Sequence, residues 1–315
     1  MYIFAANNEQ MTNNDYLYTD LSSFYGKVFP FKVQKISINA GFTCPNRDGS
    51  KGFGGCTYCN NQTFNPSYCA TQKSVSRQIE EGKTFFARKY PEMKYLAYFQ
   101  AYTGTYGELQ HLIGLYEEAL RCDDVVGIVI GTRPDCMPNE LLDYLADLAQ
   151  RTFLTVEYGI ESANDDTLRR INRGHTYAQS VEAIERTATR GIYVGAHVIL
   201  GLPGEDDAEL IRQARLVNQL PITTLKLHQL QLIKGTVMAR EYEQSPFHLY
   251  TADEYIDMVI KYISYIRREV VLERFVSSSP KDLLLAPNWN IKNYEFVEKL
   301  KKKMRELGVT QGCEV

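Results

Sequence analysis

The chain has 315 residues, of which 44% are apolar and 23% charged, as is typical of a folded globular protein, so disordered and fibrous classes are excluded. Its 35 Lys and Arg against 38 Asp and Glu give a net charge of −3, which argues against a uniformly basic nucleic-acid-binding surface but allows a local basic patch. No apolar run approaches the roughly 18 residues of a membrane helix. The first residues, Met1–Asp15, lack the pattern of a secretory signal, and we expect a cytoplasmic protein.

Apolar strand-like runs alternate with helical patterns along the chain. Six strands are expected, at Lys35–Ile38, Tyr95–Phe99, Val125–Gly131, Phe153–Ile160, Tyr193–Leu200 and Leu225–Leu232. Apolar residues at helical spacing predict helices between them, over Leu109–Tyr116, Leu141–Leu148 and Val181–Ala188, and Gly191 is expected to cap the last of these. Repeated strand–helix units imply a parallel sheet with right-handed crossovers, and therefore an α/β barrel or part of one.

The pattern changes after about residue 245. The sequence Thr251–Glu254 has the form of a capping box that starts a helix, and a strand at Val270–Val276 and a lysine-rich helix at Tyr294–Leu307 should follow. No low-complexity linker separates this part from the rest. We therefore expect an N-terminal segment over 1–34, a barrel core over 35–245 and a C-terminal α/β extension over 246–315, packed on the barrel.

Three of the seven cysteines lie close together, in a loop after the first strand. Cys44, Cys56 and Cys59 stand among Gly, Asn and Asp residues, which offer little apolar surface to bury a thiol. The two-residue spacer between Cys56 and Cys59 lets both thiolates reach one metal centre. The other four cysteines are interpreted as small buried hydrophobic residues: Cys69, Cys122, Cys136 and Cys313.

The missing fourth ligand favours an iron–sulfur cluster over structural zinc. The nearest histidine, His111, is far outside ligand spacing, whereas three cysteines can hold a cluster and leave one iron open. In α/β barrels the reactive groups lie at the carboxyl ends of the strands, in the following loops. The cysteine loop follows the first strand, so its position suits a catalytic cofactor.

These residues resemble a known family. The open-site cysteine loop resembles the radical S-adenosylmethionine (radical SAM) superfamily. Segments Gly131–Asp135, Gly159–Ser162, Arg173–His175 and Gly201–Glu205 resemble the branch of the Elongator catalytic subunit and the oxygen-independent coproporphyrinogen oxidases. The phrase GFTCPNRDG and the run Tyr98–Tyr106 resemble the YtqA/YhcC (MnmL-like) family most closely.

The resemblance implies a partial (β/α)6 TIM-like barrel and radical enzyme chemistry. Cys44, Cys56 and Cys59 would hold a 4Fe–4S cluster whose open iron binds S-adenosylmethionine (SAM). One electron from the reduced cluster would split SAM and give a 5′-deoxyadenosyl radical, which abstracts hydrogen from a substrate carbon. The resemblance also implies an electron donor such as flavodoxin or ferredoxin.

The same resemblance implies which residues bind SAM. Arg173 matches an arginine that pairs with the methionine carboxylate, and Glu161 matches a glutamine that contacts the ribose. His197 falls where related enzymes have an aspartate. Gln100 stands near the place of a Gly-Gly-Glu run that binds the methionine amine in many members and is absent here. The backbone that ends the sixth strand would face the adenine, at Ile233, Lys234 and Gly235.

Each of these side chains also has a purely structural interpretation. Glu161 could be an exposed loop carboxylate, Arg173 could form a surface ion pair, and His197 could be a hydrogen-bonded core histidine. Arg133 and Asp135 could simply pair with each other across a loop. The sequence leaves these alternatives open.

The substrate is implied by the family alone. The Elongator subunit acts on the wobble uridine of tRNA, and the YtqA branch is associated with converting its 5-carboxymethylaminomethyl(-2-thio) form to 5-aminomethyl, before a downstream methyltransferase acts. Our hypothesis is oxidation of the glycine-like methylene to an imine followed by hydrolysis, with direct decarboxylation as the rival route. Candidate RNA contacts are Lys299, Lys301, Lys302, Lys303 and Arg305 in the last helix, with Arg169 and Arg170 nearer the expected mouth.

Two other classes of function share most of these motifs. One is a radical SAM enzyme that acts on a small molecule or on another position of RNA. The other is a non-enzymatic metal-binding module that binds RNA or a protein, although the presence of both Glu161 and Arg173, which the resemblance assigns to SAM binding, argues against it.

Overall fold

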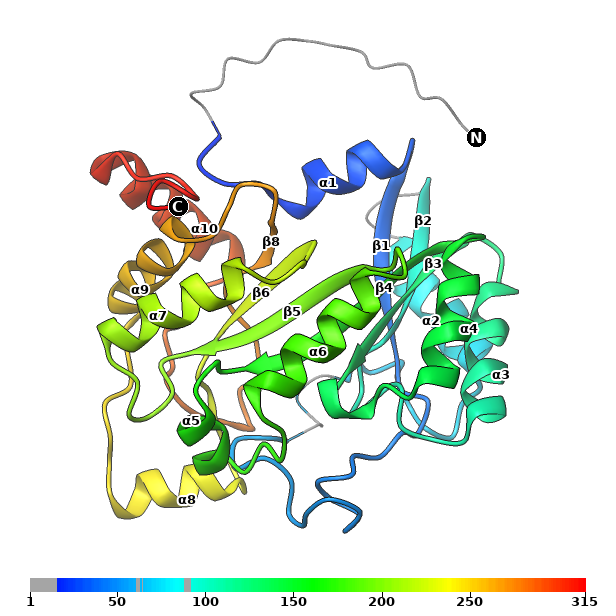
Figure 1. Cartoon of the computed structure of the whole chain (residues 1–315), viewed down its shortest axis with the longest axis horizontal. Helices are drawn as coiled ribbons and strands as arrows, with labels where there is room; N and C mark the ends of the chain where they lie inside the picture. The colour runs from blue at the N-terminus through cyan, green and yellow to red at the C-terminus, as the bar shows by residue number, and fades with distance from the viewer. Residues whose placement is uncertain (1–15, 61–62, 64, 88–91) are drawn as a thin grey trace.

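Seven parallel strands form a sheet that curls into a half-barrel with helices on its outer side (Figure 1). The computed structural model describes residues 16–60, 63, 65–87 and 92–315, so the expectation about Met1–Asp15 lies outside the described residues. The sheet order is β1-β2-β3-β4-β5-β6-β8, and neighbouring strands pair in parallel throughout. This arrangement confirms the expected α/β fold with a partial TIM-like barrel.

The strands follow the predicted runs with small changes at their ends. Their bounds are β1 Lys32–Ile38, β2 Met93–Phe99, β3 Val125–Thr132, β4 Phe153–Glu161, β5 Tyr193–Leu200, β6 Thr224–Gln229, β7 Leu232–Ile233, β8 Val271–Arg274 and β9 Leu284–Ala286. The sixth predicted run is divided, because β6 ends at Gln229 and β7 leaves the barrel to pair antiparallel with β9. The C-terminal part supplies β8, which pairs with β6 and completes the sheet.

The helices begin and end where local side chains satisfy the free backbone groups. Their bounds are α1 Leu21–Val28, α2 Val75–Ala87, α3 Leu109–Leu120, α4 Asn139–Ala149, α5 Asp165–Arg170, α6 Tyr177–Ala188, α7 Asp207–Asn218, α8 Val237–Gln244, α9 Ala252–Ser264 and α10 Asn293–Leu307. Thr251 and Glu254 form the predicted capping box of α9, and Asp206 caps α7. Gly191 lies after the end of α6 and takes the left-handed φ of +75° in the turn to β5.

The main apolar core lies between the sheet and its outer helices, and the inner face of the half-barrel is polar. On β6, Leu225 and Leu227 belong to the outer core, whereas Lys226 and His228 point to the other side, as strand alternation requires. A small apolar cluster with Leu96 and Val129 packs against α1 and plugs the amino end of the half-barrel. No helix in the described part of the chain is long and apolar enough to cross a membrane.

Candidate active site

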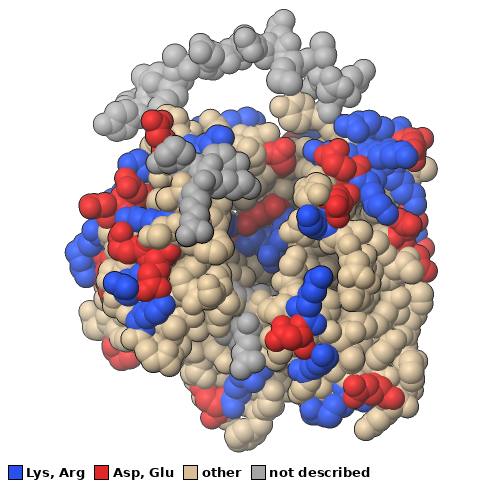
Figure 2. Space-filling view, turned by 180° about the vertical axis from the view of Figure 1, so that it is seen from behind, with Lys and Arg blue, Asp and Glu red and all other residues tan. Residues whose placement is uncertain are grey.

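A cavity lies where the carboxyl ends of the strands meet the cysteine loop. Its walls come from that loop, from the inner faces of β2 to β6, and from the segment after β8. Seen from behind, the molecule is hollowed, and acidic and basic side chains lie side by side within the hollow (Figure 2). The fold therefore brings residues from across the whole chain to one space.

All three clustered cysteines line this cavity. The loop that carries them is held on the end of α5, where Thr57 N donates to Ile171 O at 2.9 Å and Asn172 Nδ2 donates to Gly55 O at 2.8 Å. Gly55 has a φ of +76°, and a Cβ there would lie 2.8 Å from Nε of Arg47. Glycine is thus required where the loop turns close to the arginine that donates to Cys59 O.

The donors around the cysteines suit an anionic cluster. In the described part of the chain, no three His, Cys, Asp or Glu side chains gather around one point as a single metal ion would need. A cubane cluster binds each cysteine through a different iron, so its ligands need not converge. Arg173 Nη1 lies 3.6 Å from Cys56 Sγ and Asn46 Nδ2 lies 3.8 Å from the same sulfur, which fits hydrogen bonds to a thiolate or cluster sulfur.

Buried donors without hydrogen-bond partners also fit an anionic cluster in this cavity. Arg173 Nε, Arg133 Nη1 and Thr103 Oγ1 have no hydrogen-bond partner among the described residues, and all three residues line the cavity. Burial and the neighbouring Cys56 raise the pKa of the Cys59 thiol to about 11. Bound cationic iron would lower the pKa of the Cys59 thiol again and favour the thiolate. An anionic cluster with its ligand would satisfy the free donors. The residues present therefore fit the predicted cluster.

Glu161 and Arg173, the two residues that the family resemblance assigned to SAM binding, meet at the end of β4. Arg173 Nη2 lies 3.3 Å from Glu161 Oε1 and donates to Gly159 O at 2.7 Å. Glu161 has a φ of +69° at an irregularity in the strand pairing, which turns its side chain into the cavity. A Cβ on Gly159 would lie 2.6 Å from Arg173 Nη2, so the pair needs glycine beneath it. Both side chains are largely buried, so Glu161 is not an exposed loop carboxylate and Arg173 does not form a surface ion pair.

Gln100, His197 and Ile233 also line the cavity. Gln100 Oε1 accepts a hydrogen bond from Ser37 Oγ at 3.2 Å. His197 Nε2 lies 3.0 Å from Glu157 Oε2, and burial, together with Lys226, lowers the pKa of the ring. The neutral ring therefore donates to the carboxylate while one edge faces the cavity.

Other predicted residues lie away from the cavity. Lys234 donates to Asp282 O at 2.8 Å, and Lys234 and Gly235 are not among the lining residues. Arg169 and Arg170 are exposed on α5, at the same end of the sheet as the cysteine loop (Figure 1). The lysines of α10 lie at the opposite end. Arg133, by contrast, lines the cavity, and it does pair with Asp135, with Nε 2.9 Å from Oδ1.

The structure adds a charged group that the sequence reasoning missed. Glu157 accepts from Lys35 at 2.8 Å, from Lys226 at 2.6 Å and from Tyr98 Oη at 2.7 Å, inside the half-barrel. Glu273 lies 2.6 Å from Lys35. The signal was present in β6, where Thr224, Lys226 and His228 alternate with leucines, because polar residues at every second position of a buried strand indicate a polar interior.

The sequence matches two family profiles. The Radical SAM superfamily matches residues 40–217, and the Radical_SAM C-terminal domain matches residues 222–306. The chain is 34% identical to the uncharacterized protein YtqA of Bacillus subtilis, with 96% of each chain covered, and 35% identical to protein YhcC of Escherichia coli, with 92% of each covered. Elongator complex protein 3 of Saccharomyces cerevisiae is 26% identical over 59% of this chain and 33% of its own length.

Solved structures share the fold. Elp3 of the archaeon Methanocaldococcus infernus superposes with a TM-score of 0.65 at 17% identity, over 89% of this chain and 64% of that one. HydG, a maturase of the [FeFe]-hydrogenase, superposes with a TM-score of 0.52 at 12% identity, over 85% of this chain and 54% of that one.

Proposed function

The chain belongs to the Radical SAM superfamily, and from this premise we propose that it modifies tRNA, converting wobble 5-carboxymethylaminomethyl(-2-thio)uridine to 5-aminomethyl(-2-thio)uridine. The relation to Elongator complex protein 3 supports a tRNA substrate, because the family resemblance implies a wobble-uridine substrate for that protein. We further propose a flavodoxin or ferredoxin as electron donor and a methyltransferase as the downstream enzyme.

Superfamily members use a 4Fe–4S cluster and SAM. When bound, the cluster and SAM would together supply an oxidant that accepts one hydrogen atom and one electron, with methionine and 5′-deoxyadenosine as the products. We propose that Cys44, Cys56 and Cys59 hold the cluster, since they line one cavity beside the free Nε donor of Arg173. Arg47, which donates to Cys59 O, holds that ligand in place.

The chain's own residues would bind and orient SAM. The planar guanidinium of Arg173 suits the methionine carboxylate, and its buried Nε is available for a second hydrogen bond. Glu161 can accept two ribose hydroxyl hydrogen bonds, and the neutral His197 and Gln100 lie on the same cavity wall.

On the substrate, the methylene between amine and carboxylate would lose one hydrogen atom and one electron. The resulting imine adds water and separates into the aminomethyl group and glyoxylate, with one proton released. A carbon radical at this methylene is stabilised by the adjacent amine and carboxylate together. The imine route gives glyoxylate and direct decarboxylation gives carbon dioxide, so identifying the product distinguishes the two routes.

The experiment is anaerobic turnover of the reconstituted enzyme on tRNA that carries the carboxymethylaminomethyl group. We expect 5′-deoxyadenosine, glyoxylate and the 5-aminomethyl nucleoside in equal amounts by mass spectrometry. Carbon dioxide without glyoxylate would replace the imine route with decarboxylation. Formation of 5′-deoxyadenosine with unchanged nucleosides would remove tRNA as the substrate and favour a small molecule or another RNA position.

The cysteine ligands are tested by substitution. Cys56→Ser should lose bound iron, the brown absorbance and turnover, because an alcohol is a poor ligand for the cluster. Cys313→Ser is the matched control, since Cys313 is exposed and does not line the cavity. Iron content and turnover that are equal in both variants would contradict the assignment.

A further inference from the structure

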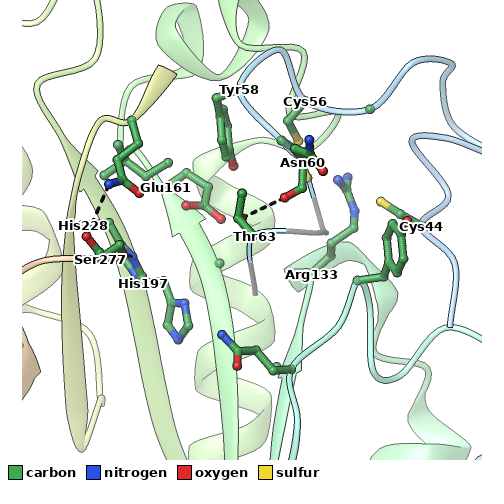
Figure 3. Close-up of a pocket in the computed structure, with 18 of the residues that line it drawn as sticks. Cys44, Cys56, Tyr58, Asn60, Thr63, Arg133, Glu161, His197, His228 and Ser277 are labelled. Atoms are coloured by element: carbon green, nitrogen blue, oxygen red, sulfur yellow. Dashed lines mark hydrogen bonds between the residues drawn. The ribbon is translucent and has the colours of Figure 1, made fainter. Parts of the chain in front are cut away.

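The cavity continues past His197 to a second polar wall between β6 and β8. His228, Arg274, Ser277 and Ser279 line this end. In Figure 3, His228 and Ser277 lie on the side of the cavity opposite Cys44 and Cys56, with Glu161 and Thr63 between them. The proposed cluster and SAM contacts do not use this wall.

Arg274 is a cation without a carboxylate partner. Its Nη2 lies 3.3 Å from Nδ1 and 3.4 Å from Nε2 of His228, and near-equal distances to both ring nitrogens place it over the ring face. Its buried Nε has no hydrogen-bond partner, and the guanidinium forms no ion pair with any residue the structure describes. A buried donor left unsatisfied is costly, so this arrangement favours a bound acceptor.

The charges around Arg274 leave one positive charge in excess. Lys226, its register partner on β6, lies 2.6 Å from Glu157 and 3.0 Å from Glu273, and Lys35 contacts the same two carboxylates. Two carboxylates thus face three cations. Burial, and next Arg274 itself, hold the pKa of His228 well below its usual value, so the ring adds no charge. A single anion would restore neutrality.

The hydroxyl groups beside Arg274 are held rigidly. Ser277 N donates to Gln229 Oε1 at 2.7 Å, and Gln229 Nε2 donates back to Ser277 O at 2.8 Å. Ser277 Oγ forms a hydrogen bond with His228 Nδ1, and Ser279 Oγ donates a hydrogen bond to Gln231 Oε1 at 2.7 Å. The segment after β8 is therefore fixed on the end of β6, which gives the guanidinium a preformed wall.

We propose that this wall is the substrate's carboxylate site, in which Arg274 binds the carboxylate beside the hydroxyl groups of Ser277 and Ser279. A carboxylate matches the planar guanidinium and needs one positive charge. In the proposed substrate the reacting methylene lies between this carboxylate and the amine. Binding the carboxylate at the far wall directs that methylene toward the cysteine end. The identity of the substrate, though not the anion site, rests on the proposed function.

The first test measures binding of two tRNAs that differ only in the carboxymethyl group on the amine, which carries the carboxylate. Wild-type protein should bind tRNA with the 5-carboxymethylaminomethyl group at least about tenfold more tightly than tRNA with the 5-aminomethyl group, as expected for a charge-assisted hydrogen bond. Arg274→Gln should abolish this preference. Arg77→Gln is the control, because Arg77 is exposed on α2 and lies outside the cavity. A preference retained by Arg274→Gln would overturn the inference.

The second test does not need tRNA. Arginine Nε–H resonances of the full chain are recorded by NMR during titration with N-methylglycine or with its carboxamide, which lacks the carboxylate. The resonance that is absent in Arg274→Gln should shift with the carboxylate alone, and equal responses to both probes, or none, would overturn the inference. If this shift is seen while tRNA is neither bound nor converted, the proposed function fails and the anion site stands. If tRNA is converted while Arg274→Gln keeps the preference for the carboxylate-bearing tRNA, the anion site fails and the proposed function stands.

Discussion

Asp135 shows how one buried carboxylate holds two cations beside the cavity. It accepts from Arg133 Nε at 2.9 Å and Nη2 at 3.1 Å, and Lys51 Nζ lies 2.6 Å away. Burial opposes ionisation, but the hydrogen bonds and charges of Arg133 and Lys51 prevail and hold the pKa of Asp135 at about 2. Because the ordinary pKa of an aspartate is 3.8, the unfolded chain takes up a proton first as the pH falls.

We therefore expect Asp135→Asn to lower the free energy of unfolding by about 2 kcal/mol at pH 7. The folded-state pKa is depressed, so this contribution is full above about pH 4 and is lost between about pH 4 and pH 2. Urea unfolding at several pH values measures the difference between variant and wild type. Asp143→Asn, which removes an exposed pair with Arg190, should change stability by less than about 0.5 kcal/mol. A difference for Asp135→Asn that stays constant down to about pH 2.5 would contradict this account.

At the scale of elements, the half-barrel depends on close approach of β3 and β4. Gly127 pairs with Phe153, and a Cβ at Gly127 would clash with the Phe153 carbonyl oxygen and lie 2.8 Å from the Phe153 Cβ. Both atoms are held by the strand and cannot move aside as the end of a flexible side chain could. By contrast, a Cβ at Gly114 on α3 would meet no atom within 4 Å.

The two glycines should respond oppositely to alanine. Gly127→Ala should destabilise the protein by about 1–3 kcal/mol, because the strands must separate to admit the methyl group. Gly114→Ala should stabilise it by about 0.5–1 kcal/mol, because alanine loses less backbone freedom in a helix. Thermal unfolding of both variants checks the signs, and a stabilising Gly127→Ala would show that β3 and β4 are not packed this closely.

For the whole molecule, the question is how a chain with a net charge of −3 would bind tRNA. The lysines of α10 lie near carboxylates, with Lys299 Nζ 3.7 Å from Asp253 and Lys301 Nζ 3.8 Å from Glu298. These pairs are exposed and therefore weak, so phosphates can compete for the lysines. Since α10 lies at the other end of the sheet from the cavity, we propose that it binds tRNA away from the reacting base.

We expect tRNA affinity to fall steeply with salt, because bound phosphates release counterions. Replacing the α10 lysines by Gln at positions 299, 301, 302 and 303 should weaken binding and reduce the salt slope by about one for each phosphate that a lysine no longer neutralises. It should not change the preference for the carboxylate-bearing tRNA. A double Arg77→Gln/Arg121→Gln variant is the control. Affinity that does not vary with salt in the wild type would count against a tRNA substrate.

Local pattern predicted much of the half-barrel. The runs over β1 to β5 and the capping box of α9 follow from alternation and from short polar motifs, which act between residues a few positions apart. The cysteine loop was also predicted. The family resemblance assigned Glu161 and Arg173 to SAM binding, but their contact with each other came only from the structure. The cysteine loop could be predicted because Cys44, Cys56 and Cys59 lie close together in the sequence.

Only the tertiary structure decided which distant residues share the interior. The pairing of β8 with β6 brings Glu273 and Arg274 beside Lys226 and His228, although nearly fifty residues of chain separate them. Strand pairing across such a distance has no local signature, because it depends on closing a long loop and on which face of each strand turns inward. The sequence by itself therefore determined the type of fold and the loop that carries the three clustered cysteines. The pairing of β6 with β8 decided the charge balance around Arg274, and the proposed carboxylate site depends on that balance.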